Sequence, residues 1–217
     1  MVLVDRTSAG QALAARLAFL QEAHPVVLGL PRGGVVVASA IAETLQAPLD
    51  VLLVRKISVP GHDELALGAI GEGAVVVGNP EVMRHAQPSP ATFERALETA
   101  RAGLARRAAL YRPARRAQPV ARRTAVLVDD GIATGATMRA AIRVLHARGA
   151  ARILVAAPVA AEPALATLTG LADQIVVLEI VKRLPSIGRC YQDFPPVCDA
   201  DVLGLLRDAA LSTPAGG

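Results

Sequence analysis

Two adjacent carboxylates, Asp129 and Asp130, follow an apolar run and carry the clearest chemical signal in this sequence. The run Val126 to Val128 is typical of a buried strand, and a turn of small residues follows it. In an open α/β sheet, ligands bind at the carboxyl ends of the strands. Two carboxylates at such a place could accept hydrogen bonds from the hydroxyls of a sugar diol.

The turn after the carboxylates has the composition of an anion site. We predict a helix from about Thr137, and a helix N-terminus presents backbone N–H groups and positive dipole to an anion. Thr134 and Thr137 add hydroxyl donors, and Gly135 lets the backbone approach an oxygen closely. No lysine follows this glycine, so an ATP-binding P-loop is disfavoured. A phosphate cradle beside two diol acceptors fits a ribose 5-phosphate.

Residues 126–138, VLVDDGIATGATM, closely resemble the phosphoribosyl diphosphate (PRPP) motif of type I phosphoribosyltransferases. The resemblance implies that Asp129 and Asp130 bind the ribose hydroxyls. It implies that the 5′-phosphate is held by Ala133, Thr134, Gly135, Ala136 and Thr137. It also implies a cytoplasmic salvage enzyme that moves ribose 5-phosphate from PRPP to a nitrogen base and releases pyrophosphate. Mg²⁺ would bind mainly through PRPP, with the two aspartates as further candidate ligands.

A second element, Leu30 to Gly34, has Arg32 followed by two glycines between a predicted strand and a predicted helix. The arginine fork suits a phosphate, and the glycines permit close approach of the backbone. The resemblance identifies Arg32, Gly33 and Gly34 as the pyrophosphate loop, which in this family often carries a cis non-proline peptide. Taken alone, Arg-Gly-Gly would indicate only a turn.

Arg55 and Lys56 follow the apolar run Leu49 to Val54, and a stretch with Gly and Pro comes next, residues 58–73. The resemblance implies a mobile loop here that closes over the reacting sugar, with Arg55 and Lys56 as catalytic contacts to pyrophosphate. His62, Asp63 and Glu64 are candidates for acid or base assistance. The alternative interpretation of this stretch is a solvated hairpin.

The sequence limits the choice of acceptor base only through the lack of one acidic residue. In 6-oxopurine enzymes of this family an acidic residue precedes the first threonine of the loop, whereas this chain has Ala133, as adenine-type enzymes do. The resemblance implies a hood over the base, for which the candidates are Lys182, Ile187, Gly188, Tyr191, Asp193 and Phe194. Tyr191 or Phe194 could stack on a base, and Asp193 could assist magnesium. Alternatively, the two rings cover an apolar edge.

Apolar runs alternate with helical patterns along the chain, which indicates a doubly wound, mostly parallel α/β sheet covered on both faces. The predicted strands are 25–30, 49–54, 125–128, 152–156 and 175–178, and 75–77 reads as half of a hairpin. We expect one phosphoribosyltransferase domain over residues 1–217. Its core spans about 25–180, with hood segments at about 1–20 and 180–210, and a basic helical insertion spans about 79–123.

Composition excludes other classes. The chain has 217 residues, of which 53% are hydrophobic, and no apolar run approaches the roughly twenty residues of a membrane span. The start has an early charge and no apolar stretch, so we predict no secretory signal. Two cysteines are too few for a disulfide scaffold or a four-ligand zinc site.

The charge is concentrated in one segment. Residues 79–123 contain ten Arg and three Glu, and a helix is predicted from Pro90 to about Tyr111. Clustered arginine is typical of phosphate-binding surfaces, so a second hypothesis is a PRPP-sensing regulator that binds nucleic acid or a protein partner. No nucleic-acid recognition motif is visible. A solvated helix, or one at a homodimer interface, accounts better for these arginines, and a homodimer is what the resemblance implies.

Overall fold

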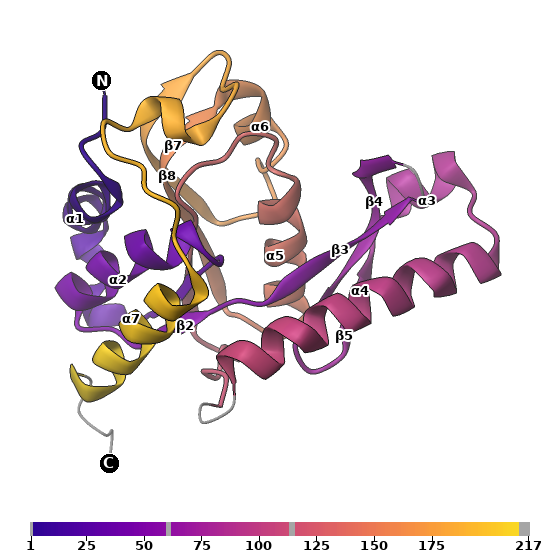
Figure 1. Ribbon diagram of the computed structural model, residues 1–217, viewed down its shortest axis with the longest axis horizontal. Coiled ribbons are helices and arrows are strands. Elements are labelled where there is room, and N and C mark those ends of the chain that lie inside the picture. Colours follow the sequence, from indigo (N-terminus) through magenta and orange to yellow (C-terminus); the bar gives the residue numbers. More distant parts are fainter. Residues whose placement is uncertain (1, 60–61, 113–115, 213–217) are drawn as a thin grey trace.

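A five-stranded parallel sheet and a three-stranded antiparallel sheet organise the molecule (Figure 1). The computed structural model describes the backbone of residues 2–59, 62–112 and 116–212, and the side chains of the same residues except 59, 62–65 and 212. The larger sheet has the order β2-β1-β6-β7-β8, with every neighbouring pair parallel. Its strands are β1 (Val26–Gly29), β2 (Leu49–Val51), β6 (Thr124–Val128), β7 (Arg152–Ala161) and β8 (Gln174–Val181).

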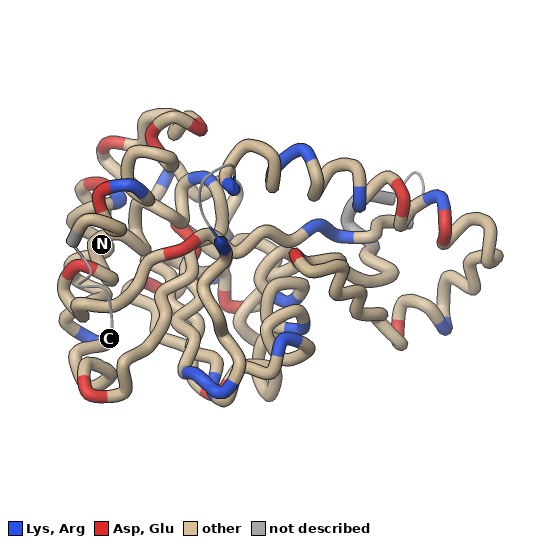
Figure 2. Tube along the Cα trace, turned by 90° about the horizontal axis from the view of Figure 1, so that it is seen from below, with Lys and Arg blue, Asp and Glu red and all other residues tan. Residues whose placement is uncertain are grey.

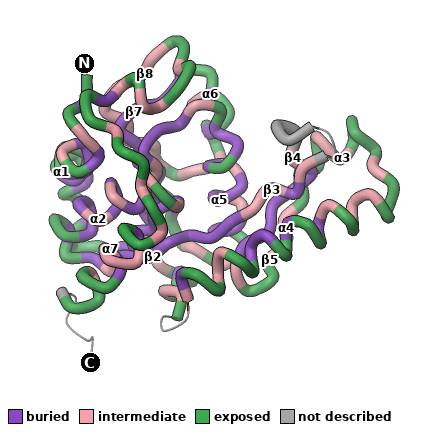
Figure 3. The backbone as a smooth tube through the Cα atoms, viewed as in Figure 1, coloured by how far each residue is buried: buried purple, intermediate pink, exposed green. Residues whose placement is uncertain are grey.

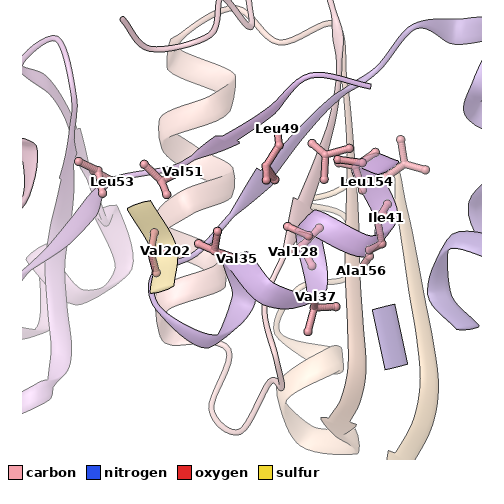
Figure 4. Packing of buried hydrophobic residues seen from close by; sticks show 14 of the residues in the cluster. Val35, Val37, Ile41, Leu49, Val51, Leu53, Val128, Leu154, Ala156 and Val202 are labelled. Atoms are coloured by element: carbon pink, nitrogen blue, oxygen red, sulfur yellow. The ribbon is translucent and has the colours of Figure 1, made fainter. Parts of the chain in front are cut away.

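Helices cover both faces of this sheet, as the alternating pattern predicts. One face packs against α1 (Arg6–Leu17), α2 (Gly33–Leu45) and α7 (Asp199–Ser212), and the other against α5 (Ala136–Ala147) and α6 (Glu162–Ala166). Side chains alternate along the strands, so Val126 faces the first layer and Leu127 the second. Figure 4 shows the first layer, in which strand and helix residues interdigitate. In Figure 3, buried residues, drawn in purple, concentrate along strands at the centre of the molecule.

The N-terminal helix α1 was not predicted. Asp5 caps it by accepting a hydrogen bond from the Ser8 amide at 2.7 Å, and a 3₁₀ turn, η1 (Ala18–Ala23), follows it. Gly10 allows α1 to lie close to α2, since a Cβ there would lie 2.7 Å from the Val37 carbonyl oxygen. Before this helix, Leu3 and Val4 form a short extended segment that pairs with residues 190–193.

A lobe projects from the core (Figure 1). It contains the antiparallel strands β3 (Val54–Val59), β4 (His62–Gly71) and β5 (Val75–Gly78), with the helices α3 (Pro80–Ala86) and α4 (Pro90–Tyr111). The hairpin half predicted at 75–77 is confirmed as β5. The single strand predicted at 49–54 is wrong, because β2 ends at Val51 and the chain leaves the main sheet before β3 begins.

The basic helix predicted from Pro90 to Tyr111 is confirmed as α4. Ser89 caps it by accepting a hydrogen bond from the Thr92 amide at 3.2 Å, and Pro90 occupies the first turn, where its missing N–H costs nothing. Basic segments recur along this long helix (Figure 2). The apolar side of α4 packs on β3 and β4 through Leu97, Ala100 and Leu104.

Arg112 joins the lobe to the core. Its guanidinium donates to Asp50 Oδ1 of β2 at 2.7 Å and forms a two-pronged ion pair with Glu72, at 2.7 and 2.8 Å, in the turn between β4 and β5. The Asp50 side chain is 1% exposed, and its carboxylate also accepts hydrogen bonds from the amides of Val51 and Gln118. The arginine therefore ties three segments that are distant in sequence.

Within the described ranges, no helix combines the length and the apolar character that crossing a membrane requires.

Candidate functional site

Asp129 and Asp130 lie at the end of β6, the central strand of the larger sheet. The Asp129 amide donates to the Ala156 carbonyl of β7 at 3.2 Å, so the first aspartate still follows the ladder, and the chain turns at Asp130. The Asp130 amide donates to Asp129 Oδ1 at 2.9 Å. Burial, followed by the charge of Asp130, raises the pKa of Asp129 well above its ordinary value. Such a pair of like charges is stabilised by a cation or by hydrogen-bond donors.

Arg6 supplies a donor to this pair. Its Nε lies 2.8 Å from Asp130 Oδ2, and both side chains are largely buried, at 9% and 12% exposed. The same guanidinium donates to the Pro195 carbonyl at 2.9 Å and lies 3.6 Å from the centre of the Phe194 ring. Sequence reasoning assigned Arg6 no role. The cap at Asp5 was a signal that a helix begins at Arg6, but nothing local indicated its partner 124 residues away.

Tyr191 holds the same aspartate from the backbone side. Its hydroxyl donates to the Asp130 carbonyl at 2.7 Å, its ring centre lies 4.9 Å from that of Phe194, and the residue is buried. Burial, followed by the nearby Asp130 charge, raises the Tyr191 pKa. The structure thus brings Tyr191 and Phe194 to the predicted site. Both rings already have protein partners there, in line with the alternative that they cover an apolar edge.

Three of the other hood candidates, Asp193, Ile187 and Gly188, lie next to this cluster. The Asp193 amide donates to the Val4 carbonyl at 2.9 Å, and the Asp193 side chain is exposed. Ile187 belongs to the 3₁₀ turn η2 (Ile187–Cys190) and contacts Gly131, where a Cβ would lie 2.7 Å from it. Gly188 lies against the Phe194 ring in the same way, and Lys182 follows β8.

The turn from Gly131 to Gly135 is anchored on β7. The Ile132 amide donates to the Val159 carbonyl, and the Ile132 carbonyl accepts from the Ala161 amide, both at 2.9 Å. Gly135 has a positive φ of 71° and immediately precedes α5, which begins at Ala136, one residue before the prediction. The exposed residues Thr134 and Thr137 flank this helix start. The Ala136 amide donates to the Thr134 hydroxyl oxygen at 3.4 Å, so these two members of the predicted phosphate loop lie side by side at the helix N-terminus.

The Pro31–Gly34 loop borders the aspartates. The Pro31–Arg32 peptide is cis, and α2 begins at Gly33. A Cβ on Gly33 would lie 1.8 Å from Asp130 Oδ2, and one on Gly34 would lie 2.8 Å from the Asp129 Cα. Both glycines are therefore required because the loop touches the aspartates themselves, a reason that the sequence did not indicate.

The sequence predicted that Arg55 and Lys56 follow a strand at 49–54. In the structure both residues lie within β3. Successive side chains of a strand point to opposite faces, so the structure separates these two predicted cations. Arg55 faces α4, since a Cβ on Gly103 would lie 2.9 Å from its Nε. His62, Asp63 and Glu64 belong to the backbone of β4, but their side chains lie outside the described residues.

Several known proteins are similar to this chain. The family model of the phosphoribosyl transferase domain matches residues 6–166. Two proteins of Mycobacterium tuberculosis, strains CDC 1551 and H37Rv, each named "Putative phosphoribosyl transferase", are 45% identical over 205 residues. This alignment covers 94% of the chain and 46% of each relative, so the chain spans about half the length of the curated relatives that it matches.

Solved structures share the fold of this chain. The crystal structure of TT1426 from Thermus thermophilus has a TM-score of 0.89 and 44% identity, with 96% of this chain and 99% of that chain covered. The AQ2163 protein from Aquifex aeolicus shares the fold, with a TM-score of 0.51, 13% identity and coverage of 84% and 78%. The fold is that of a doubly wound α/β protein, with Asp129 and Asp130 at the carboxyl end of its central strand. The chain belongs to the phosphoribosyl transferase domain family.

Proposed function

We propose that this chain transfers ribose 5-phosphate from PRPP to a nitrogen base and releases pyrophosphate. The observation that carries the proposal is the Asp129–Asp130 pair, which follows the central strand and lies between the Pro31–Gly34 loop and the turn before α5. Such a site offers acceptors for a diol at its centre and donors for anions on two sides.

The ribose hydroxyls would donate to the carboxylates of Asp129 and Asp130. The Arg6 ion pair holds Asp130 in one orientation while this happens. The 5′-phosphate would accept hydrogen bonds from the backbone of Ala133 to Ala136 and from the hydroxyls of Thr134 and Thr137. These donors lie at the first turn of a 12-residue helix, where the dipole favours an anion.

The residues present suit Mg²⁺. Two adjacent carboxylates supply the hard oxygen ligands that this ion prefers, and Mg²⁺ commonly binds through one or two carboxylates together with substrate phosphates. When bound, the ion neutralises charge on the departing pyrophosphate. Asp129 and Asp130 are the residues that would hold it beside the sugar.

The pyrophosphate would lie on the opposite side of the sugar from the 5′-phosphate, against Arg32, Gly33 and Gly34. Its departure leaves an oxocarbenium-like sugar at C1′, which the acceptor nitrogen attacks from the other face. The chain contributes positioning and fixed charges rather than a covalent intermediate. Arg55 is a second cation on the pyrophosphate side, and Lys56 stays a predicted contact.

The acceptor would approach under the two ends of the chain, residues 1–20 and 180–210, which we propose as the hood. Ala133 replaces the acidic residue of the 6-oxopurine enzymes, which disfavours hypoxanthine, guanine and xanthine. Tyr191, Asp193 and Phe194 are the hood candidates. A cytoplasmic location and a homodimer belong to the same proposal, and light scattering after gel filtration tests the homodimer.

Calorimetric titration of PRPP with Mg²⁺ tests the assignment. We expect Asp129→Asn combined with Asp130→Asn to abolish detectable binding, because amides cannot replace two acceptors for the diol and the ion. Glu94→Gln combined with Glu98→Gln removes the same charge from the exposed side of α4 and should leave affinity unchanged. A full-affinity Asp129→Asn, Asp130→Asn double variant that keeps the wild-type circular dichroism spectrum would refute the site.

Pyrophosphate release with a panel of bases separates transfer from sensing. At least one base should support release in the presence of PRPP and Mg²⁺. If PRPP binds and no base reacts, the chain is better explained as a PRPP-sensing regulator, for which the arginine-rich segment supplies a surface for an acidic partner.

A further inference from the structure

A basic cavity lies where the Pro31–Gly34 loop, β3, α4 and the start of α7 meet. Its volume is about 440 Å³, and its polar lining comes from Arg32, Arg55, Arg106, Arg107, Tyr111 and Asp199. We propose that Arg106 and Arg107 of α4, with Arg55, form a further wall of the pyrophosphate site. This inference rests on the proposed transferase function, and it assigns a role to two arginines that the strand-end motifs leave without one.

The helix is built to admit Arg55. A Cβ on Gly103 would lie 2.9 Å from both Nε and one terminal nitrogen of the Arg55 guanidinium. A larger residue at 103 would therefore displace the guanidinium from its present position against α4. Arg106 and Arg107 follow Gly103 by three and four positions, so they lie one turn further along the same side of the helix. Three cationic side chains thus converge from two elements on one cavity.

The charges of this cavity are not balanced internally. Among the described residues, no carboxylate lies within 4.0 Å of the guanidinium groups of Arg32, Arg55, Arg106 or Arg107. Asp199, the one acidic residue in the lining, accepts a hydrogen bond from the Tyr111 hydroxyl. Four like charges around a concave surface repel one another, so an anion that accepts from several of them stabilises the arrangement.

The position favours pyrophosphate over other anions. The cavity begins at Arg32, and the next residue, Gly33, touches the carboxylate of Asp130. An anion in the cavity would therefore lie close to a sugar held by the aspartates. The cavity volume of about 440 Å³ lies within the range of small-molecule sites, so a diphosphate fits in it. Guanidinium forks pair with phosphate oxygens at two points, which suits this ligand.

The test uses Mg²⁺-pyrophosphate and ribose 5-phosphate as separate probes in calorimetric titrations. Arg106→Gln combined with Arg107→Gln should weaken pyrophosphate binding about tenfold or more, because each charge-assisted hydrogen bond is worth about that factor. The same variant should bind ribose 5-phosphate as the wild type does. Arg95→Gln combined with Arg101→Gln is the matched control, since both side chains are exposed on α4 and neither lines the cavity.

Gly103→Ala provides a second, independent perturbation, because its methyl group would displace the Arg55 guanidinium while α4 keeps its residues at 106 and 107. It should also weaken pyrophosphate binding with ribose 5-phosphate binding retained. Unchanged pyrophosphate affinity in the Arg106→Gln, Arg107→Gln variant would overturn the inference while leaving the transferase proposal standing. A wild-type protein that binds neither PRPP nor ribose 5-phosphate would instead overturn the transferase proposal.

A short single-stranded RNA completes the set of probes. If the Arg106→Gln, Arg107→Gln variant loses a salt-sensitive RNA complex but keeps its pyrophosphate affinity, the two arginines serve nucleic acid and the inference is wrong. We expect the opposite result, in which the variant loses pyrophosphate affinity. In the wild type, pyrophosphate should then displace any RNA bound at the cavity.

Discussion

Two buried arginine–aspartate pairs, Arg6–Asp130 and Arg112–Asp50, occupy opposite roles in this molecule. Each arginine comes from the end of a helix and each aspartate from a strand of the main sheet or its end. The Asp50 carboxylate accepts from Arg112 and from two backbone amides, so both of its oxygens have donors supplied by the fold. The Asp130 carboxylate receives Arg6 on one oxygen and stands beside Asp129, another acceptor.

The difference shows what separates a structural charge from one prepared for a ligand. Asp50 is surrounded by donors, one of which is Arg112. Because Arg112 also forms an ion pair with Glu72, it connects the lobe to the core. Asp130 lies beside a second carboxylate, and burial, followed by the charge of Asp130, raises the pKa of Asp129. A donor-rich shell stabilises a carboxylate by itself, whereas an acceptor-rich site gains stability when a sugar diol or a cation arrives.

The largest effect should come from Arg112→Met. It leaves Asp50 buried without its counter-ion, and breaking a buried pair by removing one partner costs about 3–5 kcal/mol. Urea denaturation should show this loss of unfolding free energy, while the folded variant binds PRPP within about twofold of the wild type. Arg112→Met combined with Asp50→Asn should recover part of the stability. A stability loss below about 1 kcal/mol would contradict the structural role assigned to the pair.

Arg6→Met should have a smaller effect on stability and a larger one on the ligand. Its partner Asp130 is 12% exposed, against 1% for Asp50, so we expect a smaller loss of about 2 kcal/mol, as for a hydrogen bond to a charged group. PRPP affinity should fall at least tenfold, since Asp130 loses the group that orients it. Arg6→Lys keeps the charge but loses the second hydrogen bond, to the Pro195 carbonyl. Its PRPP affinity should therefore lie between those of the wild type and Arg6→Met. Equal PRPP affinity in all three proteins would show that the pair is purely structural.

The smallest effect is expected at Asp5, the cap of the helix that begins with Arg6. Asp5→Ala should cost about 1 kcal/mol of unfolding free energy at neutral pH, the usual value for a lost N-cap. Hydrogen bonds from the Ser8 amide lower the pKa of Asp5 below its ordinary value of 3.8. The stabilisation is therefore present above that value and lost as pH falls through the lower folded pKa.

Denaturation curves of the wild type and of Asp5→Ala should accordingly converge as the pH is lowered below about 4. Asp5→Asn, whose side chain caps the helix without a charge, should keep most of the unfolding free energy both at neutral pH and below about pH 4. A difference between wild type and Asp5→Ala that grows on acidification would contradict the assignment of the cap.

The lobe shows where local patterns were insufficient. Both ends of its helix α4 were predicted, because a Ser-Pro start and a long helical composition are local signals. Residues 58–73, which contain Gly and Pro, were interpreted as a mobile loop with a solvated hairpin as the alternative, whereas most of them belong to strand β4. Gly68 is there because its strand lies against β5, with a Cβ position 2.4 Å from the Val77 carbonyl oxygen. That reason exists only after the hairpin has formed.

Strand β7 gives a second example. The prediction ended this strand at Ala156, ahead of Pro158, yet the strand runs to Ala161. Its ladder with β6 ends at Ala156, and only β8 continues beside it, so the proline lies where one side of the strand no longer needs every donor. The free side then accepts the turn at Ile132.

The sequence alone determined the parallel α/β core, the carboxylate pair at a strand end and the small-residue turn before a helix, because each depends on periodicity or on neighbours along the chain. Only the tertiary structure decided that Arg6 faces Asp130, that Gly33 touches the same carboxylate and that α4 carries its arginines to Arg55. These contacts join residues tens to more than a hundred positions apart. A guanidinium carries no local mark of its partner, because the attraction between charges depends on distance in space and not on separation along the chain.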